Sequence, residues 1–489
     1  MRSFKPCLSL LLAALPLGAI AEVQPASLFV DHMVIQRDTE APVWGTADAG
    51  EAVNVSASWG ASAKTVADAD GKWSVKLQTP AAGGPHTLTF SGNNTVELQD
   101  VLSGDVWLCS GQSNMQWYVM KSLNPAKDIA SANYPLIRSF MVERNPSAEP
   151  VAECGGEWQV CSPQTVKQFS ATAYFTGRKL HEELNVPIGL LTSCWGGTRV
   201  EAWTPAEAQA EDPAVQSLSA GLAKKKKKKN KKDGPTGVSQ ANPSALYNGM
   251  IHPLSPFAVK GVMWYQGEAN AKTVKTSEHY RVQLPRMVRS WRAVWGQDFP
   301  FYAVQLPNFR SPQQEPVELQ DTWAMIRESF VLAAEATEDM YLTTTIDLGE
   351  AKNIHPKNKQ DVGLRLASTI LNHSYGQDTP TTPFLKSYSI EGHEVVLAFD
   401  YTGSGLVAND GGALKTFAIA GEDRNFVFAD AEIVTRDGVE CVVVSSAVVK
   451  EPASVRYAWA TNPVGCNLYS KEGFPASPFR TDDWEVPAK

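Results

Sequence analysis

The sequence predicts a central α/β domain with a parallel sheet, flanked by a β-rich region on each side. Short apolar runs alternate with helical stretches between about residues 101 and 375. Residues 22–100 and 376–489 instead show short strand patterns separated by glycines and prolines. Strands that alternate with helices form parallel sheets, and closely spaced short strands are typical of β-sandwiches.

The composition is that of a folded enzyme or binding protein. Of the 489 residues, 43% are hydrophobic and 20% are charged, which excludes a disordered chain and a coiled coil. The formal net charge of -8 argues against general affinity for nucleic acid. At about 100–200 residues per domain, the length predicts two to four domains.

Residues 1–21 are predicted to be a signal peptide rather than part of the fold. Arg2 and Lys5 precede an apolar run at residues 8–17, and Ala19-Ile20-Ala21 follows. This order of basic, apolar and small residues is that of a secretory signal, and the run is too short to span a bilayer. We expect cleavage near Ala21 and a secreted or periplasmic protein with no membrane span.

Six cysteines follow the predicted signal peptide, and the sequence leaves their redox state open. Cys154 and Cys161 are placed to join a hairpin, and Cys441 and Cys466 to bridge two strands, with buried free thiols as the alternative. There is no C-x-x-C or H-x-x-x-H pattern. A structural zinc site is therefore not expected.

Alternation of apolar and polar residues predicts the strands of the two flanking regions. In residues 22–100, an N-terminal β-sandwich, the alternation is clearest at 53–57 and 73–77. In residues 376–489, a C-terminal β-rich domain, we expect strands at 395–397, 426–428, 441–444 and 455–459.

The central region, residues 101–375, contains five apolar runs that are predicted to be sheet strands. These runs are at 106–108, 188–191, 259–265, 301–305 and 341–346. Helices are expected at 173–183 and 360–371, where apolar residues recur with helical spacing. Ligands of open α/β sheets bind at the carboxyl ends of strands, so functional residues should follow these runs.

The segment Gly111-Gln112-Ser113-Asn114-Met115 directly follows the first of these strands. A serine at a strand end exposes its hydroxyl as a nucleophile, and its N–H group faces a developing oxyanion. A serine that only caps a helix is equally compatible with this position. The segment is not a G-x-S-x-G elbow, because Met115 stands at the last position.

Two further segments follow the next strands. Cys194-Trp195-Gly196-Gly197-Thr198 has paired glycines, which let a backbone approach a ligand closely or simply form a turn. The segment 264–270 supplies the side-chain amides of Gln266 and Asn270 as candidate oxyanion donors.

His355 is the candidate general base. It follows the strand ending at Ile346 and immediately precedes Pro356, a residue favoured in the first turn of a helix. The positive end of a helix dipole disfavours imidazolium and keeps the histidine neutral near pH 7. A purely structural histidine is the alternative, and His252 is the main competitor, although it precedes a strand instead of following one.

Four motifs in this order resemble the sialate O-acetylesterase family of SGNH hydrolases. The motifs are Gly111-Gln112-Ser113-Asn114-Met115, Gly196-Gly197-Thr198, Gln266-Gly267-Glu268-x-Asn270 and Ile354-His355-Pro356. The resemblance extends over nearly the whole chain after residue 21, including residues 33–37 and 476–481. It implies a flavodoxin-like α/β fold and a serine esterase that removes O-acetyl groups from sialic acids and needs no metal or organic cofactor.

The resemblance also implies a role for each site residue. Ser113 attacks the acetyl carbonyl to form an acyl-enzyme, and His355 takes its proton and later activates water. The oxyanion hole consists of the N–H groups of Ser113 and Gly197 and one amide, from Gln266 or Asn270. Each such donor contributes roughly 10²–10³ in rate.

The third member of the catalytic triad is left open. SGNH hydrolases usually have an aspartate three residues before the histidine, and here that position is Lys352. Asp347 and Glu268 are the candidate acids. A backbone carbonyl that orients the imidazole, giving a Ser–His dyad, is the alternative.

The expected partner is an O-acetylated sialic acid or another acetylated glycan. Arg199 is a candidate for a bidentate contact with the sialate carboxylate, with an ordinary surface arginine as the alternative. Trp203, Trp117 and Trp195 are candidates for stacking on sugar faces, with a core role as the alternative. An acetylesterase for other polysaccharides such as xylan remains open, as does a glycan-binding protein with a decayed esterase site.

A lysine run at residues 224–232, with eight lysines in nine positions, interrupts the central domain. It is predicted to be part of a solvated surface insertion at 221–238. Attraction of acidic glycans is the functional alternative. The sequence does not predict an oligomeric state.

Overall fold

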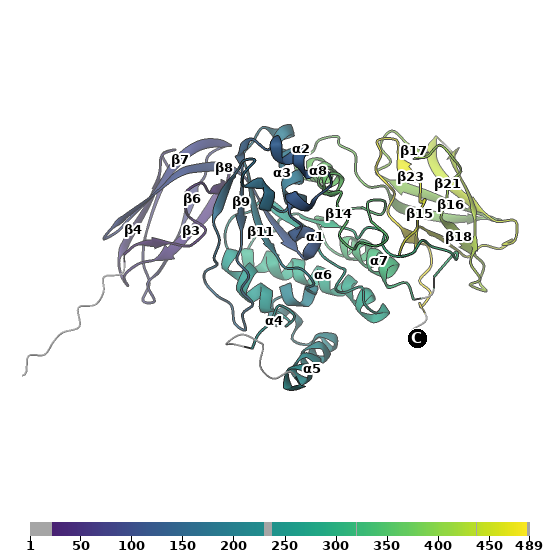
Figure 1. Ribbon diagram of the computed structural model, residues 1–489, viewed down its shortest axis with the longest axis horizontal. Helices are drawn as coiled ribbons and strands as arrows, with labels where there is room; N and C mark the ends of the chain where they lie inside the picture. Colours follow the sequence, from purple (N-terminus) through teal and green to yellow (C-terminus); the bar gives the residue numbers. More distant parts are fainter. Residues whose placement is uncertain (1–21, 229–236, 319, 437, 487–489) are drawn as a thin grey trace, which may run out of the picture.

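The computed structural model describes residues 22–228, 237–318, 320–436 and 438–486. Sheets near the amino end and sheets near the carboxyl end lie on opposite sides of a central α/β region (Figure 1). The predicted signal peptide, residues 1–21, lies outside the described residues. Among the described helices, none is long and apolar enough to cross a bilayer.

Parallel strands form most of the central sheet. In spatial order the strands are β10 (Trp158–Cys161), β9 (Tyr134–Met141), β11 (Ile188–Cys194), β8 (Thr95–Gly111), β12 (Gly261–Tyr265), β13 (Phe301–Val304) and β14 (Met340–Thr343). Every neighbouring pair from β9 to β14 is parallel, and each predicted apolar run overlaps one of these strands. The sheet as a whole is mixed, because β10 and β7 (Gly83–Ser91) pair antiparallel with β9 and β8 around the predicted parallel strands.

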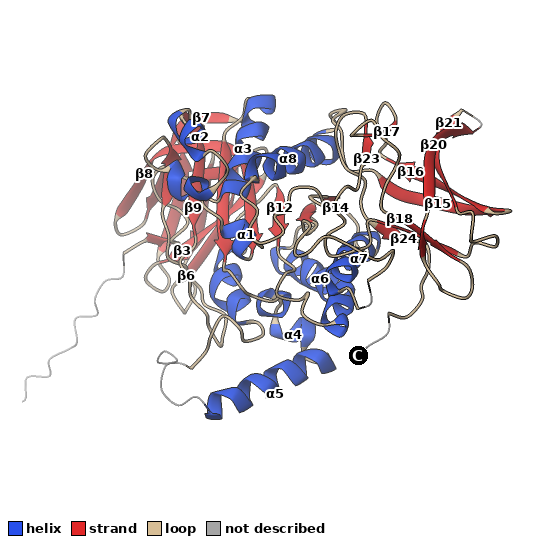
Figure 2. Cartoon of the chain, turned by 45° about the vertical axis from the view of Figure 1, so that its right-hand side comes forward, coloured by secondary structure: helices blue, strands red, loops and turns tan. Residues whose placement is uncertain are grey.

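Helices cover the central sheet on opposite sides (Figure 2). The helix α3 (Ala171–Leu184) packs against α8 (Lys359–Tyr375), and α6 (Val274–Trp295) packs against α7 (Thr322–Glu335). Local signals fix their ends, since Ser170 and Asn358 cap α3 and α8 through their side chains. The predicted helices at 173–183 and 360–371 are confirmed. Shorter helices are α1 (Ser113–Gln116), α2 (Pro125–Ala130) and α4 (Ala206–Gln209).

The N-terminal strands form two layers. One sheet contains β1 (Gln24–Pro25), β3 (Glu40–Thr46) and β6 (Lys72–Gln78), and β2 (Val34–Gln36), β4 (Ala52–Ala57), β5 (Ser62–Val66) and β7 join the sheet of β8. In β6, alternate residues are buried, as predicted, and Trp73 packs on Phe90 of β7 across the layers, with ring centroids 5.9 Å apart. The strand β8 serves both regions, so the boundary predicted at residue 100 falls inside a continuous strand.

The C-terminal strands enclose an apolar core of their own, from Val395 to Phe479. One sheet contains β15 (Phe384–Glu391), β16 (Glu394–Asp400), β21 (Val439–Ser445) and β20 (Asp430–Arg436). The second contains β19 (Val427–Phe428), β18 (Phe417–Ala420), β22 (Ser454–Tyr457) and β24 (Phe479–Arg480), and β17 (Leu406–Ala408) pairs with β23 (Leu468–Ser470). All four strands predicted here overlap observed strands.

The lysine run differs from the prediction of a loop. The helix α5 (Pro213–Lys228) includes the backbone of residues 224–228, because lysine is a good helix former and continues a helix begun upstream. Residues 229–236 lie outside the described residues. The six cysteines after residue 21 are free, and all except Cys466 are buried, so the structure favours the free-thiol alternative.

Candidate active site

The predicted motifs meet because the ends of three strands are in register. Cys194 of β11 and Tyr265 of β12 are both paired with Gly111 at the end of β8. Gly111 has a φ of +138°, and a Cβ atom there would lie 2.2 Å from the carbonyl oxygen of Tyr265. Only glycine fits such a close approach. The three segments that follow these strands therefore lie at one edge of the sheet, as predicted.

Ser113 and His355 are in direct contact, although they are separated by 242 positions in the sequence. Ser113 is the first residue of α1, and its Oγ lies 2.8 Å from Nε2 of His355. This distance places the imidazole within reach of the serine proton. The indole of Trp117 stacks on the imidazole with ring centroids 5.1 Å apart and an interplanar angle of 15°.

His355 lies in a loop and not at the start of a helix as predicted. The helix α8 begins at Lys359, because Asn358 caps it by accepting a hydrogen bond from the N–H of Asp361. Burial, together with the positive charge of Lys359, lowers the pKa of His355 below its ordinary value of 6.5. The histidine is therefore neutral near pH 7, for a different reason from the predicted helix dipole.

A buried pair of side chains joins the serine segment to the histidine segment, and we call it the Asn114–Lys359 bridge. Asn114 Oδ1 accepts a hydrogen bond from Lys359 Nζ at 2.7 Å, and Asn114 Nδ2 donates to the carbonyl oxygen of Ile354 at 3.1 Å. Lys359 Nζ also donates to the carbonyl oxygen of Pro356 at 2.7 Å. Lys359 belongs to none of the predicted motifs, and its spacing of four residues from His355 is its one signal in the sequence.

Two backbone N–H groups are suited to the predicted oxyanion hole. The Gly196-Gly197 turn lies against Ser113, since a Cβ atom on Gly196 would lie 3.1 Å from Cβ of Ser113. Gln116 Oε1 accepts a hydrogen bond from the N–H of Gly196 at 3.0 Å and holds the turn in place. Within the described hydrogen bonds, the N–H groups of Ser113 and Gly197 have no acceptor. Both are therefore available to a ligand.

The two predicted amide donors are buried and occupied by internal hydrogen bonds. Gln266 Nε2 donates to Gln112 Oε1, to the carbonyl oxygen of Thr198 and to Asn270 Oδ1, at 2.9–3.2 Å. Asn270 Nδ2 donates to Glu201 Oε2 at 3.0 Å. These contacts do not support the expectation that either amide supplies the third oxyanion donor. They indicate that both side chains hold neighbouring loops together.

Neither candidate acid contacts the histidine in the described hydrogen bonds. Asp347 forms a bidentate ion pair with Arg365, with distances of 2.6 and 2.7 Å. Glu268 Oε1 accepts from Asn114 Nδ2 at 2.5 Å, and burial raises the pKa of its carboxyl group. Among the described hydrogen bonds, Glu268 is therefore linked to the Ser113 segment only through Asn114, and Asp347 is paired with Arg365 of α8.

The predicted sugar-binding residues fall in different places. Trp203 is wrong as a stacking surface, because its side chain is fully buried and donates a hydrogen bond to Thr198 Oγ1. Trp117 and Trp195 are half-buried. Arg199 lines a cavity of about 330 Å³ together with Lys275 and His279. None of the described ion pairs includes Arg199.

A cavity of about 400 Å³ lies next to α1, and its lining includes Gln116, Tyr118, Glu143, Arg144 and Glu157. The guanidinium carbon of Arg144 lies 5.1 Å from the ring centroid of Trp195, the residue before the glycine turn. Arg144 belongs to none of the predicted motifs, so no pattern in the sequence indicates it.

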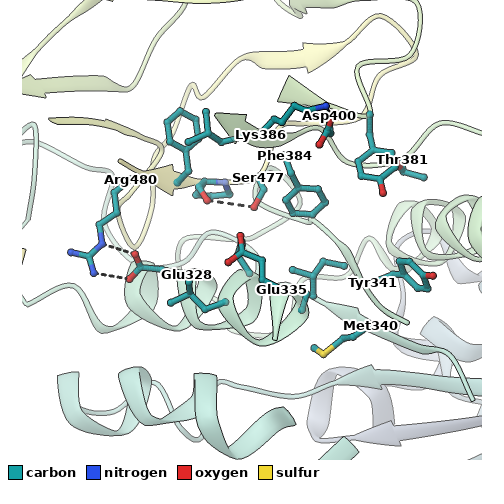
Figure 3. Close-up of a pocket in the computed structure, with 18 of the residues that line it drawn as sticks. Glu328, Glu335, Met340, Tyr341, Thr381, Phe384, Lys386, Asp400, Ser477 and Arg480 are labelled. Atoms are coloured by element: carbon teal, nitrogen blue, oxygen red, sulfur yellow. Dashed lines mark hydrogen bonds and ion pairs between the residues drawn. The ribbon is translucent and has the colours of Figure 1, made fainter. Parts of the chain in front are cut away.

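A separate cavity of about 490 Å³ lies between α7, β14 and the C-terminal sheets (Figure 3). Phe384 and Ser477 lie across it from Glu335, and the Glu328–Arg480 ion pair lies at one side. None of the predicted site residues lines this cavity.

A serine and a histidine in hydrogen-bond contact at the carboxyl edge of an α/β sheet are the arrangement found in serine hydrolases. The family model for carbohydrate esterases described as sialic acid-specific acetylesterase matches residues 103–372. The chain therefore belongs to this family of carbohydrate esterases.

Similar proteins agree with this assignment over most of the chain. A sialate O-acetylesterase of Rattus norvegicus is 29% identical, with 96% of each chain covered. The sialate O-acetylesterase of Homo sapiens is also 29% identical, covering 93% of this chain and 91% of its own. A crystal structure of a carbohydrate acetylesterase from Xanthomonas citri is 38% identical, with a TM-score of 0.84 over 94% of this chain and 100% of that chain.

Proposed function

We propose that the protein is an exported serine esterase that removes O-acetyl groups from sialic acids or related acetylated sugars through an acyl-enzyme. The contact of 2.8 Å between Ser113 Oγ and His355 Nε2 carries the proposal. The neutral imidazole favoured by burial is the form that accepts the serine proton.

The reaction follows from this geometry in two halves. His355 takes the proton of Ser113 as Oγ attacks the acetyl carbonyl, and the N–H groups of Ser113 and Gly197 stabilise the oxyanion. The imidazolium then protonates the departing sugar oxygen, which leaves an acetyl group on Ser113. A water molecule then attacks this ester as His355 takes its proton, and the imidazolium returns that proton to Ser113 Oγ as the acetyl group departs as acetic acid, which ionises to acetate.

The strand order supports the flavodoxin-like arrangement that we propose for the hydrolase region. Counting β8 as the first strand, then β11, β12, β13 and β14, gives the spatial order 2-1-3-4-5. This is the order of flavodoxin-like folds. In this interpretation β9 and β10 are additional strands at one edge.

We propose a Ser–His dyad in place of a triad. Both candidate acids are engaged elsewhere, Asp347 with Arg365 and Glu268 with Asn114. Asn353 holds the backbone of His355 on both sides, accepting from its N–H at 3.0 Å and donating to its carbonyl oxygen at 2.7 Å. Backbone contacts and the stacked Trp117 thus orient the imidazole.

The sugar is proposed to occupy the cavity of about 400 Å³ beside α1. Its size suits one or two sugar rings, and Arg144 lies beside the half-buried Trp195. A sialate carboxylate on that side would pair with the Arg144 guanidinium. Glu143 and Glu157 line the same cavity and suit the hydroxyl groups of a neutral sugar, so acetylated polysaccharides such as xylan remain the second candidate.

The decisive test is acetate release from a chromogenic acetyl ester, acetylated sialic acid and acetylated xylan. Ser113→Ala should abolish all three activities while the protein remains folded. Retention of the wild-type rate by Ser113→Ala would overturn the serine mechanism. Absence of activity in the wild type on every acetyl ester would instead favour a glycan-binding protein with a decayed site.

Two arginine variants separate the substrate classes. If the substrate is a sialate, Arg144→Ala should raise KM for acetylated sialic acid and leave the neutral chromogenic ester unaffected, with Arg199→Ala as the matched control. A rise in KM for acetylated sialic acid in Arg199→Ala alone would show that Arg199, as the sequence predicts, binds the sialate carboxylate. Equal rates on both glycans, unchanged in both variants, would remove the case for sialate recognition.

Export is part of the proposal, on the basis of the signal-like residues 1–21. Its test is N-terminal sequencing of the protein recovered from outside the cytoplasm of its host. A mature chain that begins near Glu22 is the expected result.

A further inference from the structure

We propose that Lys359 is a positioning residue that holds His355 in its reactive orientation through the Asn114–Lys359 bridge. The inference rests on the proposed Ser113–His355 mechanism. It assigns to a buried lysine and an asparagine the orienting role that an acid performs in a catalytic triad.

The contacts of the bridge enclose His355 from both directions along the chain. Asn114 Nδ2 donates to the carbonyl oxygen of Ile354, the residue before the histidine. Lys359 Nζ donates to the carbonyl oxygen of Pro356, the residue after it. Since Asn114 directly follows the nucleophile, the bridge fixes the serine segment and the histidine segment relative to each other.

The environment of Lys359 indicates a specific role for its amino group. The residue is 0% exposed, a state that is rare for lysine without compensating partners. Nζ lies 5.5 Å from the ring centroid of Tyr265 and 6.0 Å from that of Trp117, the indole that stacks on His355. An ammonium has three donors, and here two meet oxygen acceptors while aromatic rings face the group.

Nearby charged groups and burial both affect the protonation of Lys359. Glu268 and Glu350 are the acidic groups that act on Lys359, and burial lowers the pKa of Lys359 to about 7. A neutral amine retains two N–H bonds, which suffice for Asn114 Oδ1 and the Pro356 carbonyl. The bridge therefore persists in both protonation states, while the positive form also lowers the pKa of His355.

The first test is Lys359→Met in the full chain, measured with a neutral chromogenic acetyl ester. We expect kcat to fall on the order of 10²-fold, as for a misplaced catalytic group, with KM changed by less than about twofold, because Lys359 is buried and does not line the cavity beside α1. The acidic limb of the pH–rate profile should move to higher pH, because the charge that lowers the pKa of His355 is gone. Lys357→Met, at an exposed neighbouring lysine, is the matched control and should behave as wild type.

A second variant keeps the test decisive if Lys359→Met does not fold. Asn114→Ala cuts the bridge at its other end and should lower kcat to a similar degree. The double variant should be no slower than the slower single variant, since both changes break one connection. Folding of each variant is checked by thermal unfolding.

The outcomes distinguish this inference from the function on which it rests. If Ser113→Ala is inactive but folded Lys359→Met keeps the wild-type kcat and pH profile, the bridge has no positioning role. Additive losses in the double variant would also overturn it. If Ser113→Ala remains active, the proposed mechanism itself is wrong.

Discussion

Two loops at the same edge of the sheet carry candidate site residues, and they are held in very different ways. The loop after β12 contains Gln266, Glu268 and Asn270, all buried and bonded to other loops. The loop after β14 carries His355 on a partly exposed segment, and Lys352 in this loop is exposed. The first loop is held by buried hydrogen bonds and forms a rigid base, whereas the second leaves the proposed general base, His355, partly exposed.

This difference teaches that a polar residue at a strand end is not by itself a catalytic residue. Gln266 and Asn270 have the residue type and the position expected for oxyanion donors, yet both amides donate to internal acceptors. His355 has few side-chain contacts beyond Ser113 and Trp117. The proposed catalytic group is the one with the fewest internal hydrogen bonds.

The largest expected effect is on the loop after β12. Gln266→Ala removes a side chain that donates to three acceptors and accepts from the hydroxyl of Tyr280 at 2.9 Å. Buried partners left unsatisfied cost about 1–3 kcal/mol each, so the free energy of unfolding should fall by about 3 kcal/mol or more. Denaturant titration measures it, and a loss below about 1 kcal/mol would show that this loop is not the rigid base.

Glu268→Gln should lower kcat by about 10- to 10²-fold, as expected for a group that acts through Asn114. Loss of a triad acid lowers kcat by about 10⁴-fold. Steady-state kinetics thus separates the two roles by magnitude. A loss near 10⁴-fold would place Glu268 in a triad and contradict the dyad.

Asp347→Asn should affect stability more than catalysis, although Asp347 lies in the loop after β14. The substitution weakens a half-buried bidentate pair with Arg365, and we expect the free energy of unfolding to fall by about 1–2 kcal/mol. kcat of the folded protein should stay within about twofold. A large loss of kcat with unchanged stability would restore Asp347 as a catalytic acid.

The pH dependence of activity tests the loop after β14 directly, and its expected effect is smaller than those above. Burial lowers the pKa of His355 below 6.5, and the base must be neutral to accept the serine proton. kcat/KM should therefore be constant near pH 7 and fall as the pH drops through a midpoint below 6.5. A midpoint above 6.5 would indicate that a nearby acid raises the pKa of His355 instead.

The smallest effect is expected for Lys352→Ala, at the position that usually carries the triad aspartate. The side chain is exposed and takes part in no described hydrogen bond or ion pair. kcat/KM and the free energy of unfolding should match those of the wild type. A clear loss of activity would show that this lysine reaches the substrate.

The sequence predicted the strand ends and the Ser113–His355 pair, because both depend on local patterns and on the parallel order of strands. It did not predict the Asn114–Lys359 bridge, since no periodicity links residues 245 positions apart. The expectation that His355 lies at a helix N-terminus was wrong, because α8 begins at Lys359 after its cap Asn358 and not at Pro356. Trp203 is buried and cannot stack on a sugar, and residue spacing does not show which of the 14 tryptophans are buried.

The unbroken strand β8 has a consequence for dissecting the protein. Its first half pairs with β2 and β7, and its last residue, Gly111, lies two positions before the nucleophile. A fragment that begins at residue 101 would sever this strand and strip hydrogen-bonding neighbours from the remaining half. The N-terminal sheets are therefore not a detachable appendage, and a minimal catalytic fragment of this enzyme has to begin before them.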